Sequence, residues 1–166
     1  TGLDIHSAED ISSMFLDCKA LKKLDLSGLD VSRVQNFTGL LMGCSSLTEV
    51  NLAGWHTSSG MWMAFIFSGC EKLKALDVSG FDTRNMGNAV AMFEYCASVE
   101  TLDVSGFDTS KCQNFSSMFS GMAKLSQLDV SGFDTSNATV LGAMFSMMKN
   151  MKTIDVSGFN TGNCED

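Results

Sequence analysis

The stretch LDVSGFDTS occupies residues 102–110 and recurs unchanged at residues 128–136. A near-copy, LDVSGFDTR, occupies residues 76–84, so the three copies start at equal intervals, twenty-six residues apart. The same interval extends along the chain when units are aligned on the apolar residue that opens each stretch. These opening residues are Leu24, Val50, Leu76, Leu102, Leu128 and Ile154. Because the interval has no insertion or deletion, each unit predicts one turn of a coil, and stacking covers the apolar side that a single unit leaves exposed.

The repeat organises the whole chain of 166 residues into a single array. We expect a partial repeat at 1–23, five full repeats at 24–49, 50–75, 76–101, 102–127 and 128–153, and a partial repeat at 154–166. The pattern is already under way at Gly2 and is unfinished at the other end. We therefore expect the array to be a fragment of a longer chain.

Each repeat predicts one short strand followed by one short helix. Leu-Asp-Val-Ser alternates apolar and polar residues, which is typical of a strand of about three to five residues. A glycine then turns the chain, and a large apolar residue follows it in the core. Further on, apolar residues such as Val34, Phe37, Leu41 and Cys44 have the spacing of one helical face. The predicted fold is an α/β solenoid whose neighbouring strands form a parallel sheet. The structural positions are Gly28, Gly54, Gly80, Gly106, Gly132 and Gly158, with Phe81, Phe107 and Phe133 among the apolar residues that follow them.

The motif L-x-x-L-x-V-x-x-F, as in Leu125, Leu128, Val130 and Phe133, resembles a leucine-rich repeat. The phase M-F-x-x-C-x-x-L-x-x-L at residues 14–24 is similar to BspA-like leucine-rich repeats, and the unit as a whole resembles a bacterial surface-protein repeat of the same period. The resemblance covers essentially the whole chain, although Phe or Trp stands where leucine-rich repeats usually have Asn. It implies a right-handed leucine-rich-repeat-like coil, an extracellular or cell-surface location, and adhesion or binding of a protein or glycan.

Composition and motifs exclude several classes of function. The net charge of −8 argues against binding to nucleic-acid phosphates. No apolar run approaches the roughly 18 residues of a membrane span, so we expect no direct membrane insertion by this segment. We find no Ser–His–Asp or Cys–His arrangement and no glycine-rich phosphate loop, and an aspartate that recurs in every repeat is unlike a unique catalytic residue. We therefore expect the chain not to be an enzyme.

Four cysteines share one repeat position, which Met122 and Met148 occupy in later repeats. A position filled by Cys or Met predicts a buried apolar slot with reduced thiols. Disulfides between adjacent coils remain open because stacked Cα atoms lie within bonding range. Zinc is disfavoured, since the chain has no C-x-x-C and only two histidines. The four cysteines are Cys18, Cys44, Cys70 and Cys96.

Polar residues that face outward from the predicted strands are candidates for binding. Stacked aspartates repel one another, which hydrogen bonds from the turn backbone and the neighbouring serines can offset. The alternative is a row of Ca²⁺ sites, because Ca²⁺ prefers carboxylate oxygens, although no calcium-loop motif supports it. The candidates on this face are Asn51, Asp77, Ser79, Asp103, Ser105, Asp129 and Ser131.

The repeat at 50–75 departs most from the pattern. His56 replaces an aspartate, and Trp62 stands where other repeats have Asn or Val. Met61 and Trp62 together predict either an exposed apolar patch, which often marks a contact surface, or a tryptophan folded over the small Gly60. We expect His56 to be a polar loop residue, because no nucleophile or second histidine is placed beside it.

Three functions remain open. The first is a non-enzymatic surface or secreted module that binds a protein or glycan, with Met61, Trp62 and His56 as further candidates for its site. The second is a structural spacer or lattice segment of a larger assembly, in which the ends of the stack could associate end to end. The third is ice binding through a column of outward threonines, which capping of the predicted helices explains equally well.

Overall fold

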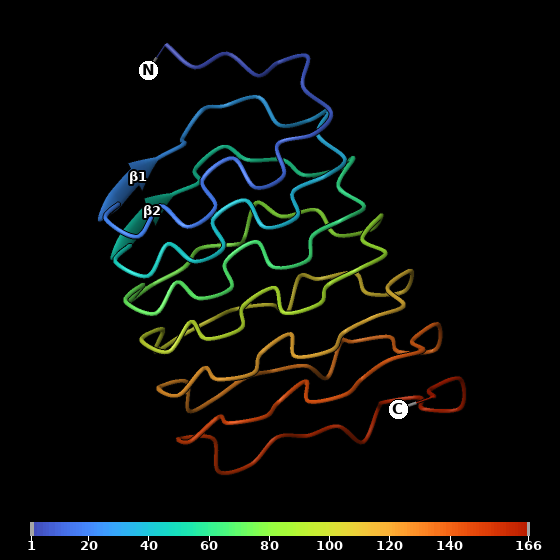
Figure 1. Cartoon of the computed structure of the whole chain (residues 1–166). Coiled ribbons are helices and arrows are strands. Elements are labelled where there is room, and N and C mark those ends of the chain that lie inside the picture. The colour runs from blue at the N-terminus through green and yellow to red at the C-terminus, as the bar shows by residue number, and fades with distance from the viewer. Residues whose placement is uncertain (1, 166) are drawn as a thin grey trace.

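The computed structural model describes residues 2–165, and in it the chain winds through successive coils that stack one upon another (Figure 1). The N-terminus lies at one end of the stack and the C-terminus in its last coil. Parallel bridges join Asn36 to Trp62 and Trp62 to Asn88, so each step from coil to coil advances the chain by one repeat. Contacts between coils therefore follow the period of the sequence.

The most regular part of each coil is a run of eight residues, called here the turn segment. In the segment at 37–44, every second N–H, beginning with those of Phe37 and Gly39, donates to a carbonyl oxygen of the next coil at 2.7–2.9 Å. The N–H groups between them, beginning with that of Leu40, donate to the carbonyl three residues back at 3.1 Å and close β-turns. Alternate N–H groups of the turn segment thus close turns within a coil and form a ladder of hydrogen bonds to the next coil. The turn segments are 11–18, 37–44, 63–70, 89–96, 115–122 and 141–148.

The predicted helix is wrong, and with it the α/β solenoid, because residues 2–165 contain no helix and only two short strands. In the turn segment at 37–44, Gly39 and Gly43 have φ values of +65° and +74°, in the left-handed region that an α-helix does not include. Bulky residues adopt the same conformation in other coils, with φ of 59° at Phe65 and 54° at Tyr95. An N–H that donates to the next coil cannot also form the hydrogen bond of a helix. The apolar residues spaced three and four apart therefore lie on consecutive turns rather than on a helix.

The predicted strand forms in two repeats. Strand β1 spans Lys23–Asp25 and β2 spans Glu49–Asn51, and the two are parallel with Leu24 opposite Val50. The later copies of Leu-Asp-Val-Ser-Gly, called here the LDVSG segments, lie at 76–80, 102–106, 128–132 and 154–158. No main-chain hydrogen bond joins neighbouring members of this set in the described part of the chain. A continuous parallel sheet is therefore also wrong.

The interior is filled by the residues that the repeat predicts as apolar. Phe67, Phe93, Phe119 and Phe145 stack along the axis with ring centroids 5.7–5.9 Å apart and planes within 11° of parallel. Such offset aromatic pairs add about 0.5–1.5 kcal/mol beyond the burial of their area. Trp55 is 1% exposed, and its indole N–H donates to the carbonyl of Leu26 at 2.9 Å. The core is thus one continuous column.

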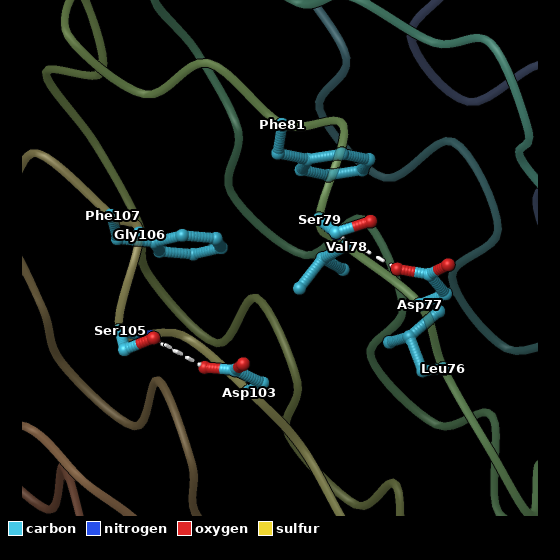
Figure 2. A pocket seen from close by; sticks show the side chains of 9 residues that line it. All are labelled: Leu76, Asp77, Val78, Ser79, Phe81, Asp103, Ser105, Gly106 and Phe107. Atoms are coloured by element: carbon cyan, nitrogen blue, oxygen red, sulfur yellow. Dashed lines mark hydrogen bonds between the residues drawn. The ribbon is translucent and has the colours of Figure 1, made fainter.

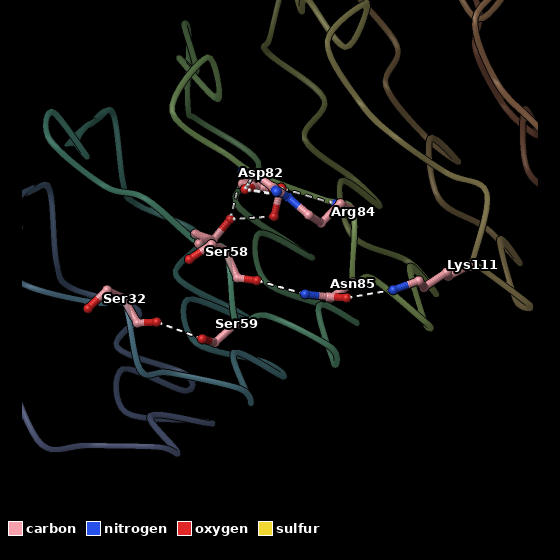
Figure 3. Close-up of polar contacts among 8 residues, drawn as sticks. Ser32, Ser58, Ser59, Asp82, Arg84, Asn85 and Lys111 are labelled. Carbon is pink, nitrogen blue, oxygen red and sulfur yellow. Dashed lines mark hydrogen bonds and ion pairs between the residues drawn. The ribbon is translucent and has the colours of Figure 1, made fainter.

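Side chains also join adjacent coils near the turn that follows the glycines at 28, 54, 80 and 106. Ser59 Oγ donates to the carbonyl of Ser32 at 2.7 Å, and Asn85 Nδ2 to that of Ser58 at 2.9 Å (Figure 3). Lys111 Nζ in turn donates to Asn85 Oδ1 at 2.7 Å. These bonds bring the edges of successive coils together.

One position of the turn segment carries a side chain in some coils and glycine in others. A Cβ built on Gly121 would lie 2.5 Å from Cδ1 of Tyr95, which belongs to the preceding coil. Gly43 is covered in the same way by Asp17. Asp17 and Tyr95 therefore each lie over a glycine of the next coil.

Candidate functional site

The aspartates of the LDVSG segments are held by the serines two residues further on. Asp77 Oδ1 accepts the backbone N–H of Ser79 at 2.9 Å, and the same bond recurs from Ser105 to Asp103 and from Ser131 to Asp129. Hydrogen bonding by Ser79, from its side chain first and its backbone second, lowers the pKa of Asp77 below its ordinary value. Local bonds of this kind favour the charged form and offset the repulsion along the column.

Most of the polar candidates line clefts on this face. Asp77 and Ser79 meet Asp103 and Ser105 across a cleft of about 290 Å³, which Phe81 and Phe107 also line (Figure 2). Asn51 and His56 line a neighbouring cleft of about 170 Å³ together with Asp77 and Ser79. Asp129 lines a wider cleft of about 490 Å³ with Asp77 and Asp103, and Ser131 is exposed.

These clefts hold no arrangement typical of a catalytic or metal centre in residues 2–165. His56, Asp77 and Ser79 line one cleft, but His56 makes no hydrogen bond to either of the others, as a catalytic triad would require. No group of three or more His, Cys, Asp or Glu side chains in this range is placed to hold a metal ion. The described residues therefore form no site that would support the Ca²⁺ alternative.

The threonine column is buried and joins coils. Thr57 Oγ1 accepts the N–H of Asp82 at 3.0 Å and donates to its carbonyl at 3.1 Å, and Thr109 and Thr135 repeat this pair with the next coil. Thr83 Oγ1 is buried without a partner among the described residues. Because these four threonines are at most 2% exposed, they do not form the outward row on which ice binding would depend.

The cysteines of the shared repeat position differ in exposure. Cys44, Cys70 and Cys96 are buried, and the thiol of Cys70 donates to the carbonyl of Leu41 at 3.3 Å. Cys18, in the first coil, is exposed, so the buried slot predicted for it is wrong. All six cysteines are free. Burial raises the pKa of the Cys70 thiol to about 12, which keeps it protonated and unreactive.

Met61 and Trp62 are exposed and line none of these clefts. Their exposed fractions are 40% and 46%. The space beside Gly60 is taken by Met63, whose Cε a Cβ on Gly60 would contact, so Trp62 does not fold into it. The bridges to Asn36 and Asn88 fix the backbone of Trp62 between the coils on either side.

The surroundings of Trp62 form a surface without charge that sequence reasoning missed. In a chain with 11 Lys and Arg and 19 Asp and Glu residues, five segments of eight residues, one in each of five successive coils, contain no charged side chain. The outward residues of these segments are mostly Gln, Asn, Thr and Ser, with Met61 and Trp62 in the second segment. Counting charge by repeat position would have revealed this surface, called here the neutral face. It is formed by 34–41, 60–67, 86–93, 112–119 and 138–145.

Comparison with known proteins places the chain in a family. A family described as "Mycoplasma protein of unknown function, DUF285" matches residues 2–102 and again residues 90–166. A search of curated proteins gives no match. Within residues 2–165, no helix has the length and apolar character needed to cross a membrane. Since the two matches together extend over nearly the whole sequence, the chain belongs to the DUF285 family.

Proposed function

We propose that this chain is a non-enzymatic binding module, located on a cell surface or secreted, and that the neutral face is its binding surface. The observation that carries the proposal is the exposure of Met61 and Trp62, at 40% and 46%, within a surface that has no charge. Large exposed apolar side chains of this kind often mark contact sites, and tryptophan is over-represented among residues that dominate binding energy.

The backbone beneath this surface supports the same function. The N–H of Trp62 donates to the carbonyl of Gln35 at 3.1 Å, and the N–H of Met63 donates to that of Asn88 at 3.1 Å. The segment is thus bonded to the coils on both sides. A rigid surface loses little conformational entropy when a partner binds, so more of the contact energy contributes to affinity.

The location rests on the resemblance to bacterial surface-protein repeats. That resemblance also favours adhesion as the setting in which the module binds a protein or glycan. Extended faces of repeat arrays commonly serve such binding.

A structural spacer is the second candidate function. It is favoured by the recurrence of one kind of bond between coils, since Thr57, Thr109 and Thr135 make the same reciprocal pair. A spacer needs regular length and stiffness and no single distinguished side chain.

The test compares two exposed aromatic residues on an array of defined extracellular proteins and glycans. Trp62→Ala is expected to lower binding at least tenfold, whereas Tyr95→Ala, which removes a ring that is 44% exposed outside the neutral face, is expected to retain it. Circular dichroism of both variants checks that the fold is kept. Absence of any binding, or equal loss in the two variants, would refute the binding proposal and favour the spacer.

A further inference from the structure

A notch lies beside Met61 and Trp62 because the next coil has no side chain at the matching position. The residues at this position in four successive coils are Gln35, Met61, Gly87 and Gln113. The N–H of Gly87 donates to the carbonyl of Met61 at 2.9 Å, and the N–H of Gln113 to the carbonyl of Gly87 at 3.1 Å, so these backbones are adjacent. A Cβ built on Gly87 would meet only the Met61 carbonyl within 4 Å, at 3.8 Å. The row of side chains is therefore interrupted at Gly87.

The groups around the notch retain free hydrogen-bonding capacity. Asn88 uses its Oδ1 to accept the N–H of Val90 at 3.0 Å, while its Nδ2 makes no bond to any described residue. Within residues 2–165, the indole N–H of Trp62 and the side-chain amides of Gln35 and Gln113 also make no hydrogen bond. Amide side chains both donate and accept, as hydroxyl groups do, so this set suits a ligand with many hydroxyls.

We propose that the notch at Gly87 binds one ring of a neutral glycan, stacked against Trp62 and bonded by the surrounding amides. This inference rests on the proposed binding function and names its ligand class. The apolar face of a pyranose ring matches an exposed indole, and its hydroxyls match the amides of Asn88 and Gln113. The neutral face contains no cation to pair with a sulfate or carboxylate, so an anionic glycan would lose hydration without gaining a partner.

The same features favour a glycan over a protein partner. Stable protein interfaces bury about 800 Å² on each side, with an apolar centre. On the neutral face, the large apolar side chains exposed beyond a third of their surface are Met61 and Trp62, and amides and hydroxyls surround them. A small aromatic platform within a polar surface suits a single ring better than the centre of a protein interface.

The test uses neutral hexasaccharides of glucose, mannose, galactose and N-acetylglucosamine, with a hexasaccharide of uronic acid as the anionic comparison. The chain has two tryptophans, and Trp55 is 1% exposed, so a soluble quencher of fluorescence reports on Trp62. At least one neutral hexasaccharide is expected to protect Trp62 from the quencher in a saturable way. The uronic-acid hexasaccharide is expected to bind at least tenfold more weakly.

Two variants locate the site, with one control. Gly87→Gln places in the notch the residue that the next coil carries at the matching position, Gln113. Because the position has room for a side chain, this variant is expected to weaken binding at least tenfold without loss of stability. Trp62→Ala is expected to do the same, measured by calorimetry, and Tyr95→Ala to bind normally. Unchanged binding by Gly87→Gln, or equal binding of the anionic hexasaccharide, would overturn the proposal. If a defined protein bound in a way that depended on Trp62, and no neutral hexasaccharide bound, the proposal of a glycan ligand would be overturned and the proposed binding function would stand.

Discussion

Replacing Gly121 by alanine is expected to lower the free energy of unfolding by about 2–3 kcal/mol, from two separate costs. Gly121 has φ +73°, and an L-residue in the left-handed region costs about 1–2 kcal/mol. The new Cβ would also lie 2.5 Å from Cδ1 and 2.9 Å from Cε1 of Tyr95. Overpacking costs about 1–3 kcal/mol, and the lower part of that range applies because the Tyr95 ring is half exposed and can move aside.

Urea unfolding measures the change, with Gly106→Ala as the matched control. Gly106 has no positive φ, and a Cβ there would meet nothing within 4 Å. Its replacement is expected to leave stability unchanged or to raise it by up to about 1 kcal/mol, since alanine restricts the unfolded chain. An unchanged slope with denaturant is required in each variant for the comparison to report stability.

A double-mutant cycle with Tyr95→Ala separates the two costs. Without the ring, Gly121→Ala is expected to cost only the backbone term of about 1–2 kcal/mol. If Gly121→Ala were as harmless as Gly106→Ala, or cost the same with and without Tyr95, the described packing of side chain over glycine would be refuted.

Three further outcomes are expected. Thr109→Val should destabilise the fold by about 1–3 kcal/mol because it removes a buried reciprocal bond to the next coil. Thr83→Val should be neutral, since Thr83 Oγ1 has no partner in the described structure. Equal losses of stability in urea unfolding would contradict this. Hydrogen bonding by Ser105, from its side chain first, lowers the pKa of Asp103 in the folded protein. The stability that this bond contributes is therefore complete above about pH 4, the pKa of an unfolded aspartate, and is lost as the pH falls through the lowered pKa of the folded state. An NMR titration that gave Asp103 an ordinary or raised pKa would contradict this. In native protein at pH 8, iodoacetamide should modify exposed Cys18 first. It should spare Cys70 and Cys112, because burial raises the pKa of each thiol to about 12. Mass spectrometry that showed Cys70 labelled as fast as Cys18 would count against the described burial.

The period and the identity of the interior residues could be predicted from the sequence. A constant interval without insertions implies equivalent coils, and apolar positions such as those of Phe93 and Phe119 are buried. These features depend on the side chains, which the sequence displays directly.

The backbone conformation could not be predicted in the same way. Apolar residues spaced three and four apart suit a helical face, but consecutive β-turns produce the same spacing when every second N–H bonds to the next coil. Glycine at positions 39 and 43 was a signal for positive φ. Phe65 and Tyr95 concealed it, because bulky residues rarely adopt that conformation.

The candidate site could be predicted in part. Met61 and Trp62 stand out because they depart from the repeat, and they are exposed. The neutral face and the notch at Gly87 depend on which coils adjoin, since a missing side chain forms a notch only between neighbours that carry one.

The uneven bonding of the coils has a mechanical consequence. The turn segments at 63–70 and 89–96 are joined by a main-chain ladder, whereas the LDVSG segments at 76–80 and 102–106 are separated by a cleft. Bending that separates the LDVSG segments breaks no main-chain bond between them, whereas bending that separates the turn segments must break several. The stack is therefore expected to open more easily along the LDVSG segments than along the turn segments.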